Sequence, residues 1–187
     1  MSNPFFSIRQ SVRAKNGVVA TSEGLASQAG LEILKQGGNA IDAAIATAAA
    51  LTVVEPTSNG IGSDCFALVY FNDKLYGMNS SGYSGRNISI EKVKALGHET
   101  MPSSGLVPIT VPGTPKGWAK LNQEFGKLSL LECLTPAINL ARNGFIISET
   151  VGFYFERAMK IYKSRNKGEE FREFFTIFTK EDGSGYK

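Results

Sequence analysis

The 187-residue sequence predicts an α+β fold in which helices pack on a small antiparallel sheet. Helical periodicity and capping signals recur from about residue 22 to residue 165. Two apolar runs between them, CFALVYF and LYGMNSS, are separated by Asn72, Asp73 and Lys74. This pattern is typical of a β-hairpin with strands at Cys65–Phe71 and Leu75–Ser81. The length favours a single domain.

The N-terminal part is expected to hold a short strand, Gly17–Thr21, followed by a first helix that Ser22 caps. The inner face of this helix is predicted from its helical spacing to be Leu25, Ala29, Ile33 and Leu34. Gly37-Gly38 ends the helix, because glycine adopts the left-handed conformation without steric cost.

A second helix is predicted from Ala40 to about Thr52, with Asn39 as its cap. Asp42 lies in its first turn, where a negative charge is favourable next to the positive end of the helix dipole. Alanine occupies nearly all sides of this helix. We therefore expect it to be buried and closely approached by its neighbours.

Further helices are predicted at Ser89–Leu96, Lys116–Phe125, Ser129–Gly144 and Glu149–Arg165. The helix at Lys116–Phe125 packs Trp118, Leu121 and Phe125 on one side. The helix at Ser129–Gly144 is expected to restart at Thr135-Pro136.

The link before Lys116 contains four prolines that forbid a continuous helix: Pro102, Pro108, Pro112 and Pro115. In the last helix, Phe153, Tyr154 and Ile161 are expected to face inward. The tail from Lys167 onward contains no predicted core-packing element.

Composition excludes several classes of function. The net charge of +3 is too small to indicate a nucleic-acid or membrane partner. No apolar run approaches the roughly 20 residues that span a bilayer, and MSNPFFSIRQSVRAK lacks the apolar core of a signal peptide. Cys65 and Cys133 form no metal-binding pattern, so we expect buried thiols in a reducing compartment and a cytoplasmic protein.

Common catalytic motifs are absent from the sequence. Gly60-Ile61-Gly62 begins a GxGxxG pattern, but Cys65 replaces the third glycine and the loop leads from a helix to a strand. His98 is the only histidine, so neither a metal site nor a cofactor is expected. Asp42 and Glu55 are better explained as a helix-start charge and a loop acceptor than as a catalytic pair.

Several segments closely resemble the N-terminal region of the γ-glutamyltransferase (γ-glutamyltranspeptidase) family, which includes cephalosporin-acylase-like members. The strongest is GGNAIDAAIA, Gly37–Ala46, followed by VVEP and GIGSDCF. ITVPGTPKGW (Ile109–Trp118), FGKLS (Phe125–Ser129) and TPAINLARNGF (Thr135–Phe145) continue the resemblance in order, over most of residues 8 to 150.

This resemblance implies an N-terminal-nucleophile hydrolase, a four-layer αββα sandwich to which this chain supplies the N-terminal helices and the central hairpin. Residues 1–187 are then a single incomplete domain of the large-subunit region of a precursor that cuts itself. The new N-terminal threonine of the small subunit is the nucleophile, with its own α-amine as base. No such segment occurs here, since Thr110, Thr114 and Thr176 lie in other contexts. The chain alone is therefore expected to contain no catalytic residue and to be inactive.

The implied partners are a small γ-glutamyl or acyl amide substrate and the remaining segments of the precursor, with a homo-oligomer possible. In glutathione-cleaving members an Asp-x-Arg-Glu segment after the second strand clamps the glutamyl α-carboxylate through paired hydrogen bonds. Here the segment reads NSSGYSGR, which places Ser81 at the position of the arginine, and Arg86 follows nearby. Asn79, Ser81 and Arg86 are the predicted substrate-binding residues.

The loop before the first strand also departs from the family pattern. Ser63 stands where the family usually has glycine, and Asp64-Cys65-Phe66 resembles the acylase-like form. Gly60, Gly62 and Asp64 are expected to form a structural loop near the site. An acyl amide without an α-carboxylate competes with γ-glutamyl compounds as the substrate. A non-catalytic binding or structural protein that keeps the fold is the alternative to an enzyme.

Overall fold

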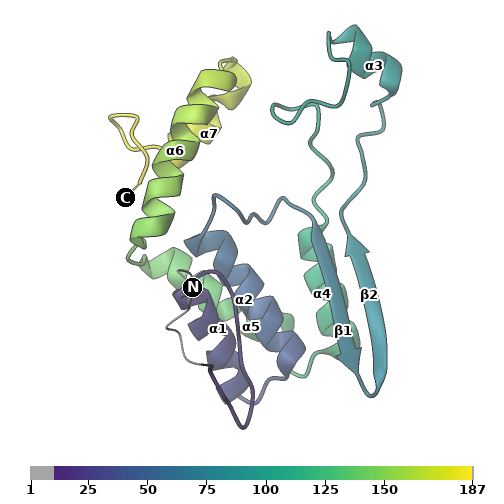
Figure 1. The fold of residues 1–187 in the computed structure, drawn as a ribbon, viewed down its shortest axis with the longest axis vertical. Helices are drawn as coiled ribbons and strands as arrows, with labels where there is room; N and C mark the ends of the chain where they lie inside the picture. The colour runs from purple at the N-terminus through teal and green to yellow at the C-terminus, as the bar shows by residue number, and fades with distance from the viewer. Residues whose placement is uncertain (1–10, 187) are drawn as a thin grey trace, which may run out of the picture.

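The computed structural model of the protein describes residues 11–186. Its elements in chain order are α1 (Gly24–Lys35), α2 (Ala40–Val54), β1 (Cys65–Phe71), β2 (Lys74–Ser80), α3 (Ile90–Ala95), α4 (Thr114–Phe125), α5 (Leu130–Asn143), α6 (Glu149–Arg165), the 3-10 turn η1 (Glu169–Phe171) and α7 (Arg172–Phe178). Figure 1 shows α1, α2, α5, α4 and the hairpin packed together, with α3 on an extended arm and α6–α7 on the other side. The predicted α+β fold is confirmed.

Helix α2 is the centre of the packed part, and the prediction that it is buried is confirmed. It packs between α1 and α5, and it contributes eight buried residues, half of them alanine. The approach of α1 is close. A Cβ added at Gly30 of α1 would lie 2.2 Å from Thr47 Oγ1 and 3.1 Å from the Ala43 carbonyl oxygen. Small side chains on both helices therefore permit this packing distance.

The ends of α1 and α2 follow the predicted capping chemistry with one correction. Glu23, not Ser22, caps α1, because its carboxylate accepts hydrogen bonds from the N–H groups of Leu25 (2.6 Å) and Ala26 (3.3 Å). Gly37 ends α1 with φ of 95°. At α2, Asn39 and Asp42 form the reciprocal bonds of a capping box.

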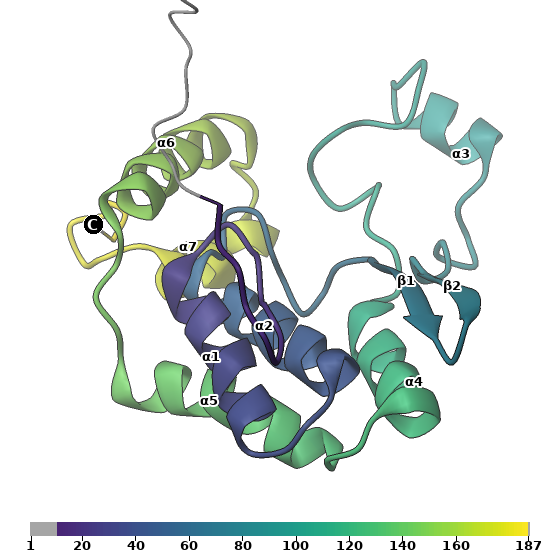
Figure 2. The ribbon, with the colours of Figure 1, turned by 60° about the horizontal axis from the view of Figure 1, so that its bottom comes forward.

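The predicted strand at Gly17–Thr21 is wrong. The segment is not part of a strand, and the sheet in residues 11–186 contains only β1 and β2. Instead, Val19 packs against Ile33 and Ala43 of the two helices, and Figure 2 shows this part of the chain running beside α1 and α2. Val19 is half-buried by this contact, whereas Gly17, Val18 and Ala20 are exposed, and no strand within residues 11–186 pairs with the segment.

The hairpin is confirmed, with β2 beginning one residue earlier than expected. The two-residue turn consists of Asn72 (φ 49°) and Asp73 (φ 60°), so Lys74 pairs with Phe71 inside the ladder. Positive φ at both turn residues matches the right-handed twist of the strands. The face toward α4 is formed by Cys65, Ala67, Val69, Tyr76 and Met78.

Helix α4 covers that face of the hairpin. Trp118 and Leu121 are buried, as predicted, and the half-buried Phe125 ring lies 5.0 Å from the Tyr76 ring. The helix begins at Thr114, two residues before the predicted start, with Pro115 in its first turn. Proline suits this position because the first N–H groups of a helix have no internal partner.

Helix α5 is continuous, so the predicted restart at Thr135-Pro136 is wrong. The capping box of Ser129 and Glu132 holds its first turn. Pro136 removes one helical hydrogen bond, but its ring is buried where α5 meets α1. Apolar burial at this contact compensates for the missing bond.

The inward face predicted for α6 is wrong. Phe153 and Tyr154 are 62% and 51% exposed, and Ile161 is 37% exposed. The buried residues are Val151, Gly152, Phe155 and Met159. The tail contributes to covering this face, because the Tyr186 ring packs 6.0 Å from the Phe155 ring.

The tail also contains elements that the sequence did not predict, η1 and α7. Neither has a fully buried residue. Phe174 of α7 packs edge-on against Tyr162 of α6 at 5.6 Å. The tail therefore forms a helical hairpin with α6 instead of joining the main core.

Candidate functional site

Three segments meet where the arm leaves the hairpin: residues 60–64, 79–86 and 109–114 (Figure 1). The Ser63 carbonyl accepts hydrogen bonds from the N–H groups of Gly113 (3.3 Å) and Thr114 (3.0 Å). The Thr114 hydroxyl donates to the same carbonyl at 2.7 Å. The loop before β1 is thus fixed to the beginning of α4.

The segment 109–114 also runs beside the end of β2. The Ser80 hydroxyl donates to the Gly113 carbonyl (2.7 Å), and Val111 N–H donates to the Tyr83 carbonyl (2.8 Å). A Cβ at Gly113 would lie 1.9 Å from the Ser80 carbonyl oxygen, and one at Gly82 (φ 82°) would lie 1.8 Å from that of Val111. Both positions require glycine. We call residues 63, 80–83 and 110–114 the junction.

Ser81 lies inside the junction and is half-buried. Its N–H donates to Asn79 Oδ1 (3.0 Å), and its carbonyl accepts from the Thr110 hydroxyl (3.4 Å). No hydrogen bond of the Ser81 hydroxyl occurs within residues 11–186. Asn79 is exposed on β2, and its side chain fixes the backbone of Ser81. The two predicted residues are therefore brought together.

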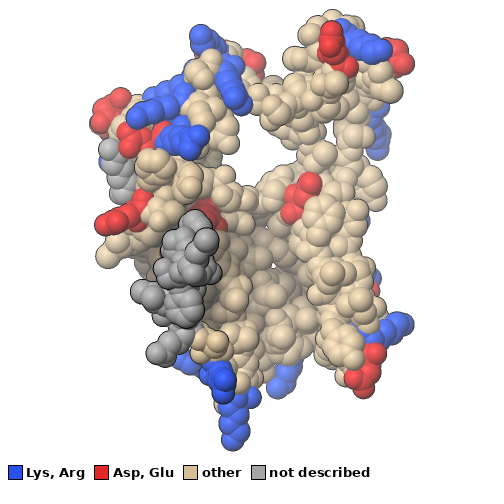
Figure 3. Space-filling model, in the orientation of Figure 1, with Lys and Arg blue, Asp and Glu red and all other residues tan. Residues whose placement is uncertain are grey.

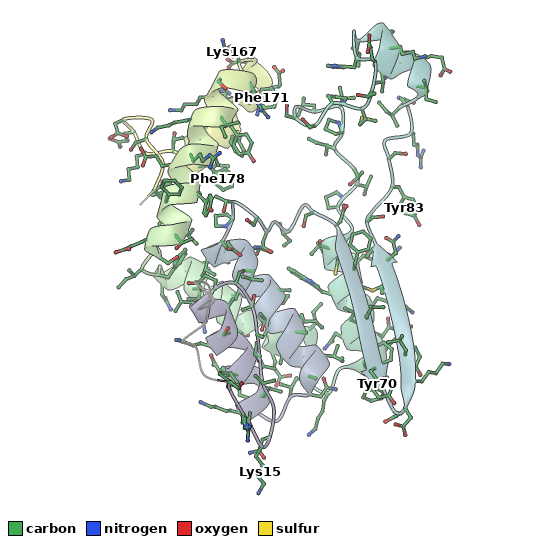
Figure 4. The ribbon with its side chains drawn as sticks, in the orientation of Figure 1. Lys15, Tyr70, Tyr83, Lys167, Phe171 and Phe178 are labelled. Carbon is green, nitrogen blue, oxygen red and sulfur yellow. The ribbon has the colours of Figure 1, made fainter. Side chains whose placement is uncertain are left out.

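Arg86 is not brought to them by any hydrogen bond or ion pair in the described part of the chain. It is exposed in the turn before α3. Tyr83, labelled in Figure 4, lies on the same segment and is 77% exposed. Whether Arg86 contacts a substrate stays a prediction.

The loop residues Gly60, Gly62 and Asp64 lie beside the junction, and the Gly60 carbonyl accepts hydrogen bonds from the N–H (3.1 Å) and the hydroxyl of Ser63. A Cβ at either glycine would meet nothing within 4 Å. Asp64 is exposed, and only its backbone carbonyl accepts a hydrogen bond, from Ser63. The residues that hold this loop are Ser63 and Thr114. In the sequence, Thr114 lies in the PGTP segment, whose prolines exclude a continuous helix and which also belongs to the family-like ITVPGTPKGW stretch.

Glu55 has the role predicted for it, a loop acceptor. Its carboxylate accepts from the Ser22 hydroxyl (2.6 Å) and from Asn59 Nδ2 (2.9 Å). These bonds join the start of the loop to the segment before α1. Glu55 is therefore a structural acceptor rather than half of a catalytic pair.

Asp42 is fully buried and does more than start a helix. Its carboxylate accepts from the N–H groups of Asn39 (2.9 Å), Lys127 (3.0 Å) and Leu128 (3.2 Å). Asn122 Nδ2 donates to it as well (3.3 Å). The α4–α5 turn is thus held on the first turn of α2, a contact that sequence reasoning did not find.

Cys133 lies against this carboxylate, with its thiol 3.6 Å from Asp42 Oδ1. Burial, followed by the negative charge of Asp42, raises the pKa of the Cys133 thiol to about 12. Burial also raises the pKa of Cys65. Both cysteines are free; Cys133 is buried as predicted and Cys65 is half-buried.

The hydroxyls of Thr110, Thr114 and Thr176 all donate to backbone carbonyls. Residues 11–186 hold no cluster of three or more His, Cys, Asp or Glu side chains suited to a metal ion. Over the same residues, no helix has the length and apolarity to cross a membrane.

The model of a protein family described as Gamma-glutamyltranspeptidase matches residues 26–187. The chain belongs to this family. A cephalosporin acylase from Bacillus halodurans, known from a crystal structure, is 49% identical in sequence to this chain. The two structures superpose with a TM-score of 0.92 over 100% of this chain and 35% of that chain. The γ-glutamyltranspeptidase of Helicobacter pylori is 27% identical, with a TM-score of 0.81 over 95% of this chain and 50% of that chain.

Curated relatives agree with these structures. The glutathione hydrolase-like YwrD proenzyme of Bacillus subtilis is 38% identical over 162 residues, which are 84% of this chain and 30% of that protein. This member of the γ-glutamyltranspeptidase family thus spans about 30% of the length of that curated relative. The expected family, its acylase-like resemblance and the N-terminal-nucleophile hydrolase fold are confirmed, because acylase and transpeptidase structures both superpose on the chain.

Proposed function

We propose that residues 1–187 are the N-terminal portion, a single incomplete domain, of a γ-glutamyltransferase-like threonine-nucleophile enzyme. The whole enzyme cleaves or transfers a γ-glutamyl or related acyl group. The observation that carries this proposal is the likeness to a cephalosporin acylase along the whole chain, at 49% identity. The relative from Bacillus subtilis is named a proenzyme, which supports a precursor that is processed.

The proposed chemistry takes place on residues outside this chain. The hydroxyl oxygen of an N-terminal threonine attacks the amide carbonyl while its α-amine takes the hydroxyl proton. The C–N bond then breaks, the leaving amine receives that proton, and an acyl-enzyme ester remains. Water or an acceptor amine takes the acyl group. In this proposal the nucleophilic threonine is not among residues 1–187, and the chain alone is expected to be inactive.

The hairpin supports the place of this chain in a larger sandwich. The face opposite α4 exposes Phe66, Leu68, Tyr70 and Leu75, of which Leu68 is 80% exposed. Apolar side chains on one face of a sheet suit packing against a second sheet. We propose that the remaining segments of the precursor provide it.

Substrate choice in this proposal depends on Ser81. A serine hydroxyl offers a single neutral hydrogen bond, whereas arginine offers a paired, charge-assisted one. The junction holds Ser81 in place through Asn79 and Thr110. An acyl amide without an α-carboxylate is therefore a stronger candidate than glutathione, unless Arg86 supplies the missing cation.

Two measurements test the proposal. The full reading frame is expressed, and self-cleavage into two chains is followed by electrophoresis. The processed enzyme is then assayed on γ-glutamyl-p-nitroanilide and on a matched acyl anilide without the α-carboxylate. Equal or faster cleavage of the second substrate is expected. Absence of both processing and turnover would instead favour the alternative, a non-catalytic binding or structural protein with this fold.

Cytoplasmic localisation and a homo-oligomer remain part of the proposal. Reduced thiols at Cys65 and Cys133 are expected in the cell, which alkylation before lysis would measure. Oxidised thiols would contradict a reducing compartment. Analytical ultracentrifugation of the processed enzyme would decide its oligomeric state.

A further inference from the structure

A cleft of about 470 Å³ lies between α6–α7 and the loop 103–109. Its wall on the helical side is aromatic and consists of Phe155, Tyr162, Phe171, Phe174 and Phe178. Figure 4 labels Phe171 and Phe178, which come from η1 and α7. The volume falls within the range of roughly 300 to 1,000 Å³ that is usual for small-molecule sites.

The aromatic wall is held by contacts among its own rings. Phe174 lies 5.6 Å from Tyr162 and 4.9 Å from Phe178. Met159 and Phe155 are buried at the base of the wall, at 4% and 6% exposure. Rings fixed in this way bind a ligand with little loss of side-chain freedom.

The charge of the lining restricts the ligand. No Lys or Arg is among the described residues that line the cleft, and the carboxylate of Glu170 is its one charged group. In Figure 3, Lys and Arg side chains lie on the outer parts of α6–α7 and of the arm. A ligand carboxylate would find no cation here, whereas a neutral apolar group would exchange water for aromatic carbon.

Two segments that line the cleft lead along the chain into the junction. Ile109 lines the cleft, and the next residue, Thr110, donates its hydroxyl to the Ser81 carbonyl. On the other side, Pro56 and Thr57 line the cleft at the start of the loop that leads to Ser63. A molecule in the cleft therefore lies beside the two segments that hold the predicted substrate-binding residues.

We propose that this cleft binds the uncharged aromatic or branched aliphatic acyl group of an amide. The assignment rests on the proposed function and narrows its substrate class to acyl amides whose acyl chain carries no carboxylate. The aromatic wall binds the acyl chain, and Ser103 and Ser104, which also line the cleft, carry the hydroxyls proposed to hydrogen-bond the amide.

The test is a titration with phenylacetamide of the full-length precursor, and of the 187-residue chain if far-UV circular dichroism shows that it folds alone, followed by NMR and calorimetry. Saturable binding of one molecule is expected. Phenylacetate, which differs by a negative charge, is expected to bind at least about tenfold more weakly, because it meets Glu170 and no cation. Binding is measured without turnover, so its loss would leave the proposed reaction standing. If the precursor binds phenylacetamide but never cleaves itself, the proposed reaction is wrong and the proposed binding site still stands.

Variants locate the binding site. Ala158→Trp fills the cleft from α6 without removing a ring of the wall, and it should abolish binding. Phe174→Ala should weaken binding about tenfold, whereas Ile177→Ala, on the exposed side of α7, should not change it. Far-UV circular dichroism checks that α7 remains folded.

The proposal is wrong if phenylacetamide does not saturate, if phenylacetate binds equally well, or if Ala158→Trp binds like the unchanged chain. It is also wrong if the chain dimerises and binding disappears as the dimer forms, since the occupant is then a second copy. Loss of binding in the full-length precursor would likewise identify the cleft as an internal protein contact.

Discussion

Helices α2 and α6 both bury apolar side chains, but they are covered in different ways. Helix α2 is covered by α1 and α5, and its first turn is fixed by Asp42. Helix α6 buries one narrow face, while Phe153 and Tyr154 on the other remain exposed. The first is held by contacts between distant segments, and the second mainly by the chain that follows it. Stability is therefore expected to reside in the α2 part.

The largest expected effect is that of Asp42→Ala. The change leaves the partly buried N–H groups of Asn39, Lys127 and Leu128 without their acceptor. The free energy of unfolding should fall by about 4 kcal/mol, as measured by urea denaturation. Glu124→Ala, which removes only an exposed ion pair with Lys120, should cost less than about 0.5 kcal/mol. Equal effects of the two would show that Asp42 does not hold the α4–α5 turn.

The two faces of α6 should separate in a second pair of variants. Phe155→Ala removes a buried ring and should destabilise the chain by about 3 kcal/mol. Phe153→Ala removes a ring that is 62% exposed and should cost less than about 1 kcal/mol. Thermal unfolding measures both. A larger loss of stability for Phe153→Ala than for Phe155→Ala would instead support the inward face predicted from the sequence.

Two glycine substitutions, one in the junction and one in the loop beside it, should differ in stability by a smaller amount. Gly113→Ala forces a Cβ to within 1.9 Å of the Ser80 carbonyl oxygen, so the junction must open. A loss of about 2 kcal/mol is expected in urea denaturation. Gly62→Ala meets no atom within 4 Å and should lie within about 0.5 kcal/mol of the unchanged chain. If Gly113→Ala is tolerated as well, the hydrogen-bonded junction is not rigid.

The smallest effect is a pH dependence from Cys133 in the α2 part. Its pKa is about 12 in the folded chain, above the ordinary value of 9.0, because burial disfavours the thiolate. The stabilisation is complete below about pH 9 and is lost as pH rises toward 12, where the unfolded chain releases the proton first. Urea denaturation between pH 8 and pH 10 should show the loss, and Cys133→Ala should reduce it. An unchanged slope in the variant would assign the pH dependence to other groups.

Part of the candidate site followed from the sequence. The resemblance pointed to the segment with Asn79 and Ser81, and the structure brings these two residues together. Their support was not predicted, because Thr110 and Gly113 contact this segment from about 30 residues away in the chain. The cleft beside α6 was missed for the same reason, since α7 and the loop 103–109 are far apart in sequence.

The local features of this protein follow from its sequence. The capping box of Asn39 and Asp42, the glycine stop at Gly37 and the Asn72-Asp73 turn all depend on neighbouring residues. The further partners of Asp42, the packing of Val19 on helices and the buried face of α6 depend on contacts between distant segments. Caps and turns are fixed by backbone geometry over a few residues. Burial is decided by whichever distant segment covers a surface, and a local pattern carries no record of that segment.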